Sequence, residues 1–300
     1  MGRTGRYLYK SSAFLGFVAI FLGAALCMPQ PANRITILND VFGKSPTLKK
    51  DWGFSALVEY GGKRILFDTG NNADIFAQNV KALGVDLKKL DLVVISHRHV
   101  DHTSGLNYLL NVNPQVKIYV PGDDVFGGVV PVNFYRRLES LPPEMQYFGG
   151  LPKETLLRGT PWPQANFVKV DRLTEIAPGI YLIPTVSQMP GTLELPEISL
   201  SIRTPKGQVL VDGCSHAGVE KIVDAATAVD PHIYLILGGL HLLKTPDSEI
   251  ERIATALHDK RKVERIAPGH CTGEPAFAIF QKVFGAQYLY AGLGTVIELP

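Results

Sequence analysis

Residues 96–102 read Ser-His-Arg-His-Val-Asp-His, a run that gathers three imidazoles and one carboxylate. His97, His99, Asp101 and His102 are all side chains that bind borderline divalent cations such as Zn²⁺. Alternation along the chain lets His97 and His99 face one point while Asp101 and His102 face a second point nearby. Two adjacent points are the arrangement that a two-metal site needs. We therefore predict a site for two divalent metal ions, with zinc as the first choice and manganese or iron as alternatives.

A buried strand is expected to position this run. Residues 91–95, Asp-Leu-Val-Val-Ile, are apolar and rich in β-branched side chains after the first position, which is typical of a strand buried in a sheet. The donors then lie on the loop at the tip of that strand, where a rigid scaffold can present reactive side chains.

The rest of the chain alternates strands and helices, as a layered α/β protein does. Gly61-Gly62 predicts a two-residue hairpin, and Asn72 can cap a helix. The expected strands are 54–60, 63–68, 91–96, 199–204, 208–211, 232–237, 263–266 and 293–299, and the expected helices are 72–83, 217–228, 248–259 and 274–283. The loops at 122–165 and 186–196 are dense in Pro and Gly, and we expect them to set substrate specificity.

The His-x-His-x-Asp-His spacing after an apolar strand resembles the signature of the metallo-β-lactamase superfamily. Other motifs of that superfamily have counterparts in the expected order: Arg64-Ile-Leu-Phe-Asp-Thr-Gly70, Val209-Leu-Val-Asp-Gly-Cys-Ser-His-Ala-Gly218 and Ala267-Pro-Gly-His-Cys-Thr-Gly273. The resemblance runs from about Ile35 to Pro300. It implies an α/β fold, the four-layer αββα metallo-β-lactamase sandwich, in a domain of residues 33–300.

A narrower set of motifs is similar to one branch of the superfamily. The set comprises Gly53-Phe-Ser55, Gly213-Cys-Ser-His216, Gly238-Gly-Leu-His-Leu242 and His270-Cys-Thr-Gly273. That branch is named after 7,8-dihydropterin-6-methyl-4-(β-D-ribofuranosyl)aminobenzene-5′-phosphate synthase, and many of its members are described only as metal-dependent hydrolases. The resemblance therefore implies a hydrolase, or a transferase that joins a pterin-like pyrophosphate to a ribofuranosyl-aminobenzene phosphate.

The resemblance also implies a ligand set. His97 and His99 belong to the first metal, which takes a third ligand from later in the chain. Asp101, His102 and His270 belong to the second metal.

The ligands from the middle of the chain depart from the superfamily pattern. A third-motif histidine would lie within 193–199, a stretch that holds none, and we predict that His216 replaces it. The superfamily's bridging Asp follows a Gly at a strand end, but the residue at that position here is Cys214. Cys214 either bridges the metals or lines the site, and Asp212 and Glu197 are the alternative ligands.

Two further polar residues follow apolar strands. His241 comes after a pair of glycines, which let the backbone approach a ligand closely. It is either a metal ligand or a proton donor, or it orients a ligand carboxylate. Asp68 is expected to be a buried acceptor that holds the signature loop. His232 and His258 lie outside the motifs, and we expect both to be structural.

The first 28 residues differ in character from the rest of the chain. Three basic residues within the first ten precede an unbroken apolar run of sixteen, 13–28, and small residues then precede two prolines. This pattern is typical of a secretory signal peptide, and the alternative is an uncleaved anchor that tethers the protein to a membrane through residues 12–28. We expect the domain to be exported to the periplasm or the extracellular space.

Composition fits one enzyme domain. A chain of 300 residues with 46% hydrophobic content can bury a large core. Without residues 1–27 the 30 basic residues fall by three and the 28 acidic residues are unchanged, so the net charge is near −1. No basic run stands out, and we expect a small-molecule substrate and no nucleic-acid partner. Cys214 and Cys271 are no disulfide framework; a single bridge between them, a thiolate ligand and a plain buried cysteine all stay open.

The ligand set suggests a mechanism. Neutral imidazoles and a carboxylate leave two divalent ions net positive, so a shared water would lose its proton near neutral pH. The hydroxide would attack an ester, lactone, phosphoester or amide, with Asp101 orienting it and His241 protonating the leaving group. We predict a dinuclear metal-dependent hydrolase. The synthase is the alternative, and a non-catalytic metal-dependent binding module is a third reading, disfavoured because binding alone needs no second metal.

Overall fold

The computed structural model describes residues 1–2, 33–131, 140, 142–146, 155–157 and 162–300. Most of the predicted leader, 1–28, lies outside these residues, as does part of the loop 122–165. Pro31–Pro300 form one compact unit. Within the described residues, no helix combines the length and the apolar character needed to cross a bilayer.

The first of two large sheets has the strand order β15-β1-β2-β3-β4-β5-β8. Its strands span Arg34–Asn39 (β1), Ser55–Tyr60 (β2), Lys63–Phe67 (β3), Leu92–Val94 (β4), Lys117–Pro121 (β5), Asn166–Val170 (β8) and Val296–Glu298 (β15). Neighbours from β15 to β3 are antiparallel, whereas β3, β4, β5 and β8 are parallel. The carboxyl ends of the parallel strands therefore lie at one edge of the sheet.

The second sheet has the order β14-β13-β12-β11-β10-β9. Its strands span Thr174–Ala177 (β9), Ile180–Val186 (β10), Pro196–Thr204 (β11), Gly207–Asp212 (β12), Ile233–Gly239 (β13) and Arg265–Gly269 (β14). Here β12, β13 and β14 are parallel, and the others pair antiparallel. Two short strands, Val129–Pro131 (β6) and Thr155–Leu157 (β7), pair only with each other.

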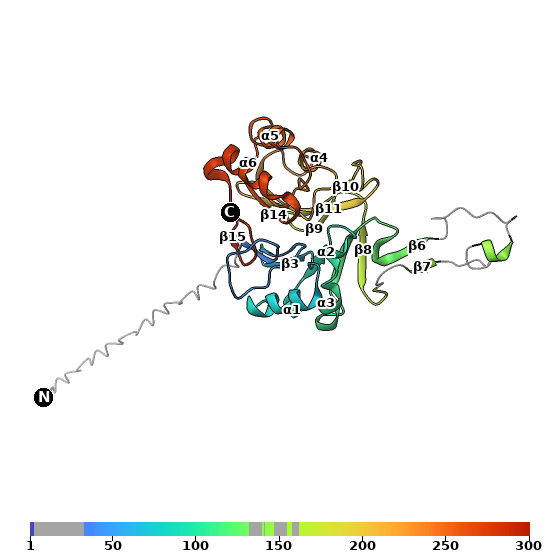
Figure 1. The fold of residues 1–300 in the computed structure, drawn as a ribbon. Helices are drawn as coiled ribbons and strands as arrows, with labels where there is room; N and C mark the ends of the chain where they lie inside the picture. The colour runs from blue at the N-terminus through green and yellow to red at the C-terminus, as the bar shows by residue number, and fades with distance from the viewer. Residues whose placement is uncertain (3–32, 132–139, 141, 147–154, 158–161) are drawn as a thin grey trace. The chain divides into compact units, whose positions relative to one another are not determined.

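Helices cover the outer face of each sheet (Figure 1). The α-helices of the described residues span Ala73–Ala82 (α1), Val100–Thr103 (α2), Leu106–Val112 (α3), Val219–Ala226 (α4), Asp247–Thr255 (α5) and Glu274–Phe284 (α6). Shorter helical turns span Leu87–Lys89 (η1), Phe126–Gly128 (η2), Pro143–Met145 (η4), Ala256–Lys260 (η6, a π-helical turn), His270–Thr272 (η7) and Gly285–Gln287 (η8).

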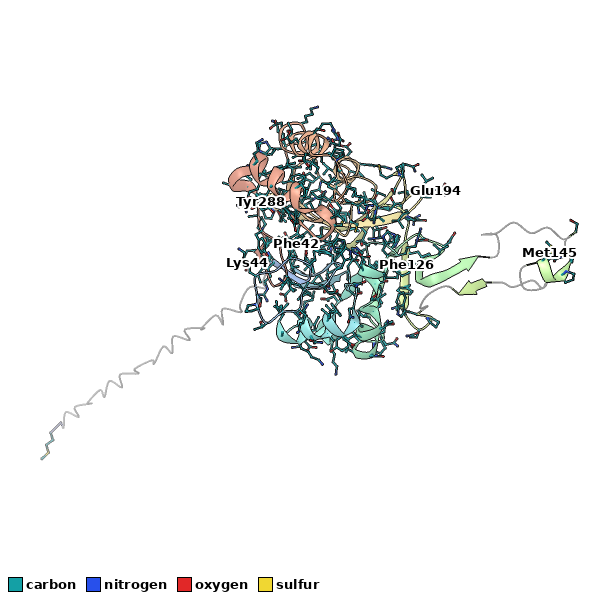
Figure 2. The ribbon with its side chains drawn as sticks, in the orientation of Figure 1. Phe42, Lys44, Phe126, Met145, Glu194 and Tyr288 are labelled. Atoms are coloured by element: carbon teal, nitrogen blue, oxygen red, sulfur yellow. The ribbon has the colours of Figure 1, made fainter. Side chains whose placement is uncertain are left out.

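Three packed cores connect four layers. Side chains from both sheets, such as Phe54 and Leu235, form the central core. A second core joins the first sheet to α1 and α3, and a third joins the second sheet to α4, α5 and α6. Side chains fill the space between the layers (Figure 2). The predicted αββα sandwich is confirmed.

Strand β4 shows why the sequence folds this way. Leu92 and Val94 face the central core, whereas Val93 faces the helices, as the two-residue period of a strand requires. Because both faces of the strand are covered, the run is continuously apolar rather than alternating.

Local signals at the element ends also hold. Gly61 and Gly62 have φ values of 57° and 77°, which only glycine adopts readily in a two-residue hairpin. The Asn72 side chain accepts hydrogen bonds from the amides of Asp74 and Ile75 and so caps α1. Strand boundaries differ from prediction in several places: β4 is shorter than 91–96, β15 is shorter than 293–299, and β11 begins before 199. Strands β1 and β5 to β10 and helices α2 and α3 were not predicted.

Candidate metal centre

The signature loop leaves β4 and enters α2, and one buried carboxylate holds it in place. Asp68, at the end of β3, accepts hydrogen bonds from the Ser96 amide (2.7 Å), the Ser96 hydroxyl (2.7 Å) and His102 Nδ1 (2.6 Å). Asp68, Ser96 and His102 are all fully buried. The bond to Nδ1 leaves His102 Nε2 free to bind an ion. This arrangement matches the role predicted for Asp68.

The first group of donors joins the two sheets. His97 Nε2 lies 3.0 Å from His99 Nδ1 and 3.3 Å from Nε2 of His216, which comes from the loop after β12. For an ion about 2.0–2.1 Å from each nitrogen, the 3.3 Å separation corresponds to an angle of about 107°, close to tetrahedral, and the 3.0 Å separation to a narrower angle of about 94°. The structure therefore places His216 beside His97 and His99. This is the position that the prediction gave it, as the substitute for the missing third-motif histidine.

The second group is formed by Asp101, His102 and His270. Asp101 Oδ2 lies 3.7 Å from His102 Nε2 and 3.5 Å from His270 Nε2. Both ring nitrogens of His270 are buried without a hydrogen-bond partner, as is Nδ1 of His216. Unpartnered buried nitrogens are costly, and a bound cation would satisfy the Nε2 atom of His270. The donors of both groups thus fit divalent ions.

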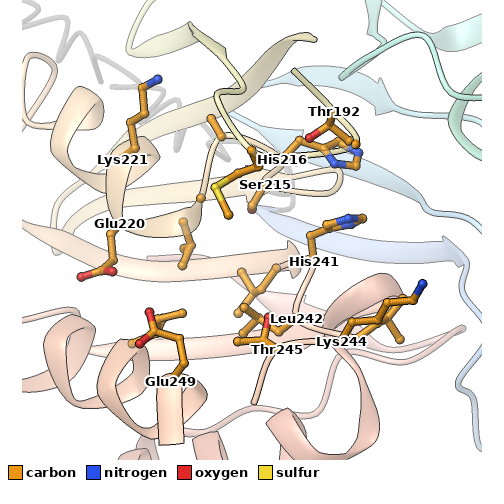
Figure 3. A pocket seen from close by; sticks show the side chains of 18 of the residues that line it. Thr192, Ser215, His216, Glu220, Lys221, His241, Leu242, Lys244, Thr245 and Glu249 are labelled. Carbon is orange, nitrogen blue, oxygen red and sulfur yellow. The ribbon is translucent and has the colours of Figure 1, made fainter. Parts of the chain in front are cut away.

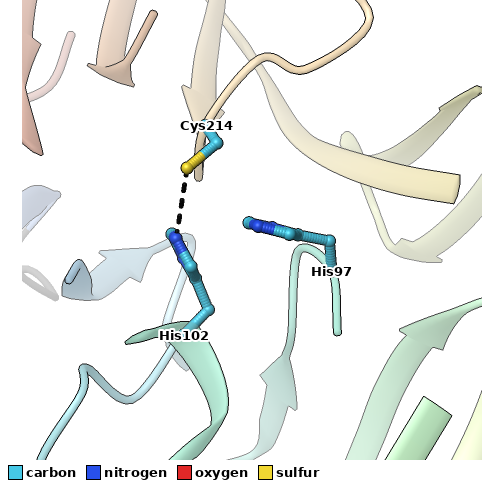
Figure 4. Close-up of side chains that lie close together, drawn as sticks. All are labelled: His97, His102 and Cys214. Carbon is cyan, nitrogen blue, oxygen red and sulfur yellow. Dashed lines mark hydrogen bonds between the residues drawn. The ribbon is translucent and has the colours of Figure 1, made fainter. Parts of the chain in front are cut away.

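Cys214 lies between these two groups. Its Sγ is 3.2 Å from His102 Nε2, and it forms a further candidate set with His97 and His102 (Figure 4). A thiolate here would be placed to contact either ion. The structure thus leaves open both predicted roles of Cys214, bridging and lining.

The two alternative ligands lie elsewhere. The Glu197 carboxylate accepts hydrogen bonds from the amides of Cys214, Ser215 and His216, at 2.7–3.1 Å, and so holds their loop. Asp212 is buried and belongs to none of the candidate donor groups of the described residues. Neither carboxylate takes the bridging position.

A third group, which sequence reasoning did not foresee, consists of Cys214, His241 and Cys271. Both thiols are free, and their sulfurs lie 3.4 Å apart, so the bridge left open by the sequence is not formed. For Cys271 the sequence left open a thiolate ligand and a plain buried cysteine, without a set of partner donors. The signal in the sequence that could have identified Cys271 as a donor was its position directly after His270, at the end of β14. The Trp52 ring centroid lies 5.2 Å from that of His270, with the two rings tilted by 58°.

The donors of the second sheet stand on unusual backbone. Ser215, His241 and His270 have φ values of 60°, 51° and 47°, in the left-handed region that non-glycine residues rarely adopt. Each such residue costs about 1–3 kcal/mol and persists only where the surrounding structure imposes it. The strained positions fall at the ends of the parallel strands, where the donors are presented.

Burial lowers the pKa of the donor imidazoles, but at His270 the neighbouring Cys271 and Asp101 outweigh burial and raise the pKa to about 10. Desolvation, reinforced by neighbouring imidazoles, lowers the pKa of His97 well below its ordinary value and that of His216 to about 3. Both rings are therefore neutral at physiological pH, the form that binds metal. Burial raises the pKa of Asp101, but the neighbouring imidazoles of His270, 3.5 Å away, and His102, 3.7 Å away, outweigh burial and keep Asp101 ionised.

A cavity of about 810 Å³ opens beside the donors (Figure 3). His216 and His241 lie on its wall, together with Met189–Thr192 of the loop 186–196 that was expected to set specificity. The cavity also has an apolar side, which includes Leu240 and Leu242. Its size is that of a small-molecule site, for which about 300–1,000 Å³ is usual. His232 and His258 lie apart from it, paired with Glu264 and Asp259 respectively.

Comparisons with known proteins agree with this fold and site. The family model of the metallo-β-lactamase superfamily matches residues 53–270. The chain is 28% identical over 293 residues to 7,8-dihydropterin-6-methyl-4-(β-D-ribofuranosyl)-aminobenzene-5′-phosphate synthase of Methanocaldococcus jannaschii, a match that covers 88% of this chain and 95% of that protein. The structure of Tm1679, a metal-dependent hydrolase of the β-lactamase superfamily, is 28% identical, with a TM-score of 0.67 over 89% of this chain and 98% of that one.

The metallo-β-lactamase fold protein YhfI of Bacillus subtilis shares the fold at 14% identity, with a TM-score of 0.58 over 90% of this chain and all of that one. Fold, donor motifs and the family match thus agree, and the chain belongs to the metallo-β-lactamase superfamily.

Proposed function

We propose that this protein is a metal-dependent hydrolase that cleaves an ester, lactone, phosphoester or amide bond in a small molecule. The observation that carries the proposal is the pair of adjacent donor groups, His97/His99/His216 and Asp101/His102/His270, the first of which reaches an open cavity through His216. Two divalent ions held there would acidify a water molecule and polarise the substrate oxygen that gains charge.

The chain's own groups would do the rest of the work. Asp101 is ionised and partly open to solvent, so its carboxylate can orient the attacking water while it also binds an ion. His241 is exposed on the cavity wall, with its ring centroid 4.3 Å from that of His216. It is therefore placed to give a proton to a leaving group on the cavity side. The apolar side of the cavity would exclude water from the substrate's body.

The synthase remains the second candidate because the M. jannaschii relative that bears this name matches nearly the whole chain at 28% identity. The Tm1679 hydrolase matches at the same identity, so relatedness alone does not choose between the two activities. A synthase would also use a metal-lined cavity, but it would join two substrates rather than admit water.

The test combines metal analysis with substrate screening. The full chain, purified without chelators, is assayed with ester, lactone, phosphodiester and β-lactam substrates, and with a dihydropterin pyrophosphate plus a ribofuranosyl-aminobenzene phosphate. Hydrolysis that is lost in Asp101→Asn and kept in His258→Ala supports the proposal. Coupling of the two synthase substrates without any hydrolysis would replace it with the second candidate.

We also propose that the protein is exported, because an apolar run of sixteen residues follows a basic start. A fusion of residues 1–35 to a reporter that is active only outside the cytoplasm should be active, and a variant with a charged residue in the centre of the run should be inactive. A silent fusion that is well expressed would refute export. A reporter that stays with the membrane fraction would indicate the uncleaved anchor.

A further inference from the structure

The nine donor side chains of the centre divide into three groups of three with no shared member. The groups are His97/His99/His216, Asp101/His102/His270 and Cys214/His241/Cys271, and in each the ligand atoms lie within 4.8 Å of one another. The first two groups provide the two metal positions of the proposed function. The third group contains both described thiols, and neither of these two metal positions takes a ligand from it.

We propose that Cys214, His241 and Cys271 form a third metal position, which takes a thiolate-binding divalent ion such as Zn²⁺, Co²⁺ or Cd²⁺. Two sulfurs and an imidazole are the donors that select such ions over Mg²⁺ or Ca²⁺. The inference goes beyond the two-metal hydrolase and does not depend on which reaction the protein catalyses. His241 fills one role at a time: with the third ion bound it is a ligand, and with that position empty it is free to act as the proton donor of the proposed function.

The sulfur geometry fits an ion. The two Sγ atoms are 3.4 Å apart, which is too long for a disulfide and suits two thiolates that share an ion about 2.3 Å from each. Two thiolates and a neutral imidazole around a divalent cation also form a group with no net charge. The cation would therefore balance the negative charges of the two buried sulfurs.

The backbone gives the third group its access to the centre. A Cβ on Gly239 would lie 2.8 Å from Cys271 Sγ and 2.3 Å from the Gly213 carbonyl oxygen, so only glycine leaves room for the thiol to face Cys214. Two residues later His241 holds a φ of 51° and brings its ring to the cavity wall. A cysteine buried only to fill the core would be surrounded by aliphatic groups. Cys271 Sγ instead lies 3.4 Å from Cys214 Sγ and 3.8 Å from the Cys214 carbonyl oxygen.

The position also has an opening. His241 is exposed, whereas Cys214 and Cys271 are buried. Three protein ligands leave one place in a tetrahedral shell, as in zinc sites that bind water or substrate. The group His97/His102/Cys214 takes one member from each of the three groups, so Cys214 is the point at which the third position meets the other two.

Cobalt titration of the full chain tests this inference. Metal-free protein is titrated with Co²⁺, and bound metal is measured by elemental analysis while thiolate-to-cobalt charge transfer is followed in the near ultraviolet. We expect three equivalents in the wild type. Cys271→Ser and His241→Ala should each hold two equivalents, and Cys271→Ser should also lose part of the charge-transfer absorbance. His258→Ala, a surface histidine, should still hold three.

Several results would overturn the inference. They are two equivalents in the wild type, three in Cys271→Ser, or a Cys214–Cys271 disulfide in the protein as isolated, detected by thiol titration. If Cys271→Ser does not give a cooperative thermal transition, the exposed position of His241 makes His241→Ala the deciding variant. A protein that binds three ions but hydrolyses none of the substrates would refute the proposed function and leave the third metal position standing.

Discussion

The two sides of the metal centre are built in different ways. The first sheet supplies four donors from the single connection 97–102, whereas the second sheet supplies five donors from the ends of three strands. These five are Cys214, His216, His241, His270 and Cys271. One side is a local motif, and the other exists only because β12, β13 and β14 end at the same edge.

The two sides also differ in how their donors are held. On the first, Asp68 and Ser96 tie the loop down with buried hydrogen bonds. On the second, Glu197 likewise holds the loop of Cys214 and His216, but His241 and His270 stand on strained backbone and both ring nitrogens of His270 lack a hydrogen-bond partner. The first side is therefore set in advance by the protein's own contacts, whereas the second has donor atoms that a bound ion would satisfy. Four substitutions test this difference.

The largest effect is expected from His216→Ala, which removes a donor from the second side. Loss of a ligand's supporting partner alone lowers metal affinity by about 10–100-fold, and loss of the ligand itself should cost at least that. The variant should release the ion of the His97/His99 group, keep the ion of the Asp101/His102/His270 group and lose most hydrolysis. In the control variant His258→Ala, the metal content measured by elemental analysis and the turnover rate should both be unchanged. Full metal content and near-normal turnover in His216→Ala would show that His216 is only a neighbour.

Asp68→Asn tests the first side, where no ligand is removed. The amide keeps the size of the carboxylate but weakens the hydrogen bonds that orient His102 and Ser96. We expect metal affinity to fall by about 10–100-fold, measured by competition with a chelator. Asp86→Asn is the matched control, because Asp86 only caps the exposed turn η1. If Asp68→Asn bound metal like the wild type, the first side would not depend on this carboxylate.

Gly213→Ala tests the contact between the two sides. An added Cβ would lie 2.2 Å from the Ser96 hydroxyl and 2.9 Å from Asp68 Oδ2. Overpacking of this kind costs about 1–3 kcal/mol of unfolding free energy, which denaturant titration would show. At Gly122 the nearest atom to an added Cβ is 3.2 Å away, and Gly122→Ala should cost less. Equal losses in the two variants would show that the sides are not packed tightly at Gly213.

The smallest effect is expected outside the donors, at Glu220 on α4. Arg252 Nη2 donates a hydrogen bond to its carboxylate at 2.5 Å, and this contact, with Arg261, lowers the pKa of Glu220. The stabilisation is therefore present above the ordinary pKa of 4.5 and is lost as the pH falls below it. Surface pairs contribute about 0–1 kcal/mol, so Glu220→Gln should lower stability slightly at pH 7 and by less at pH 3. A loss of bound metal in this variant would mean that the surface of α4 does influence the centre.

The sequence alone determined the fold class and the first side of the centre. Periodicity, the glycine hairpin and the Asn72 cap are local properties, because they depend on residues next to each other in the chain. The spacing of His97, His99, Asp101 and His102 is local in the same sense. The structure keeps these four donors together because a single loop carries them.

Only the tertiary structure decided how the second side is arranged. His216 had been singled out by the lack of a histidine in 193–199, but its 3.3 Å approach to His97 depends on the packing of one sheet against the other. Glu197 was a candidate ligand on residue type, whereas its three amide contacts make it a support for the loop. The pairing of Cys214 with Cys271, 57 positions apart, was likewise beyond sequence reasoning. Residue type states which atoms can bind an ion, but strand order and backbone conformation decide which of those atoms meet.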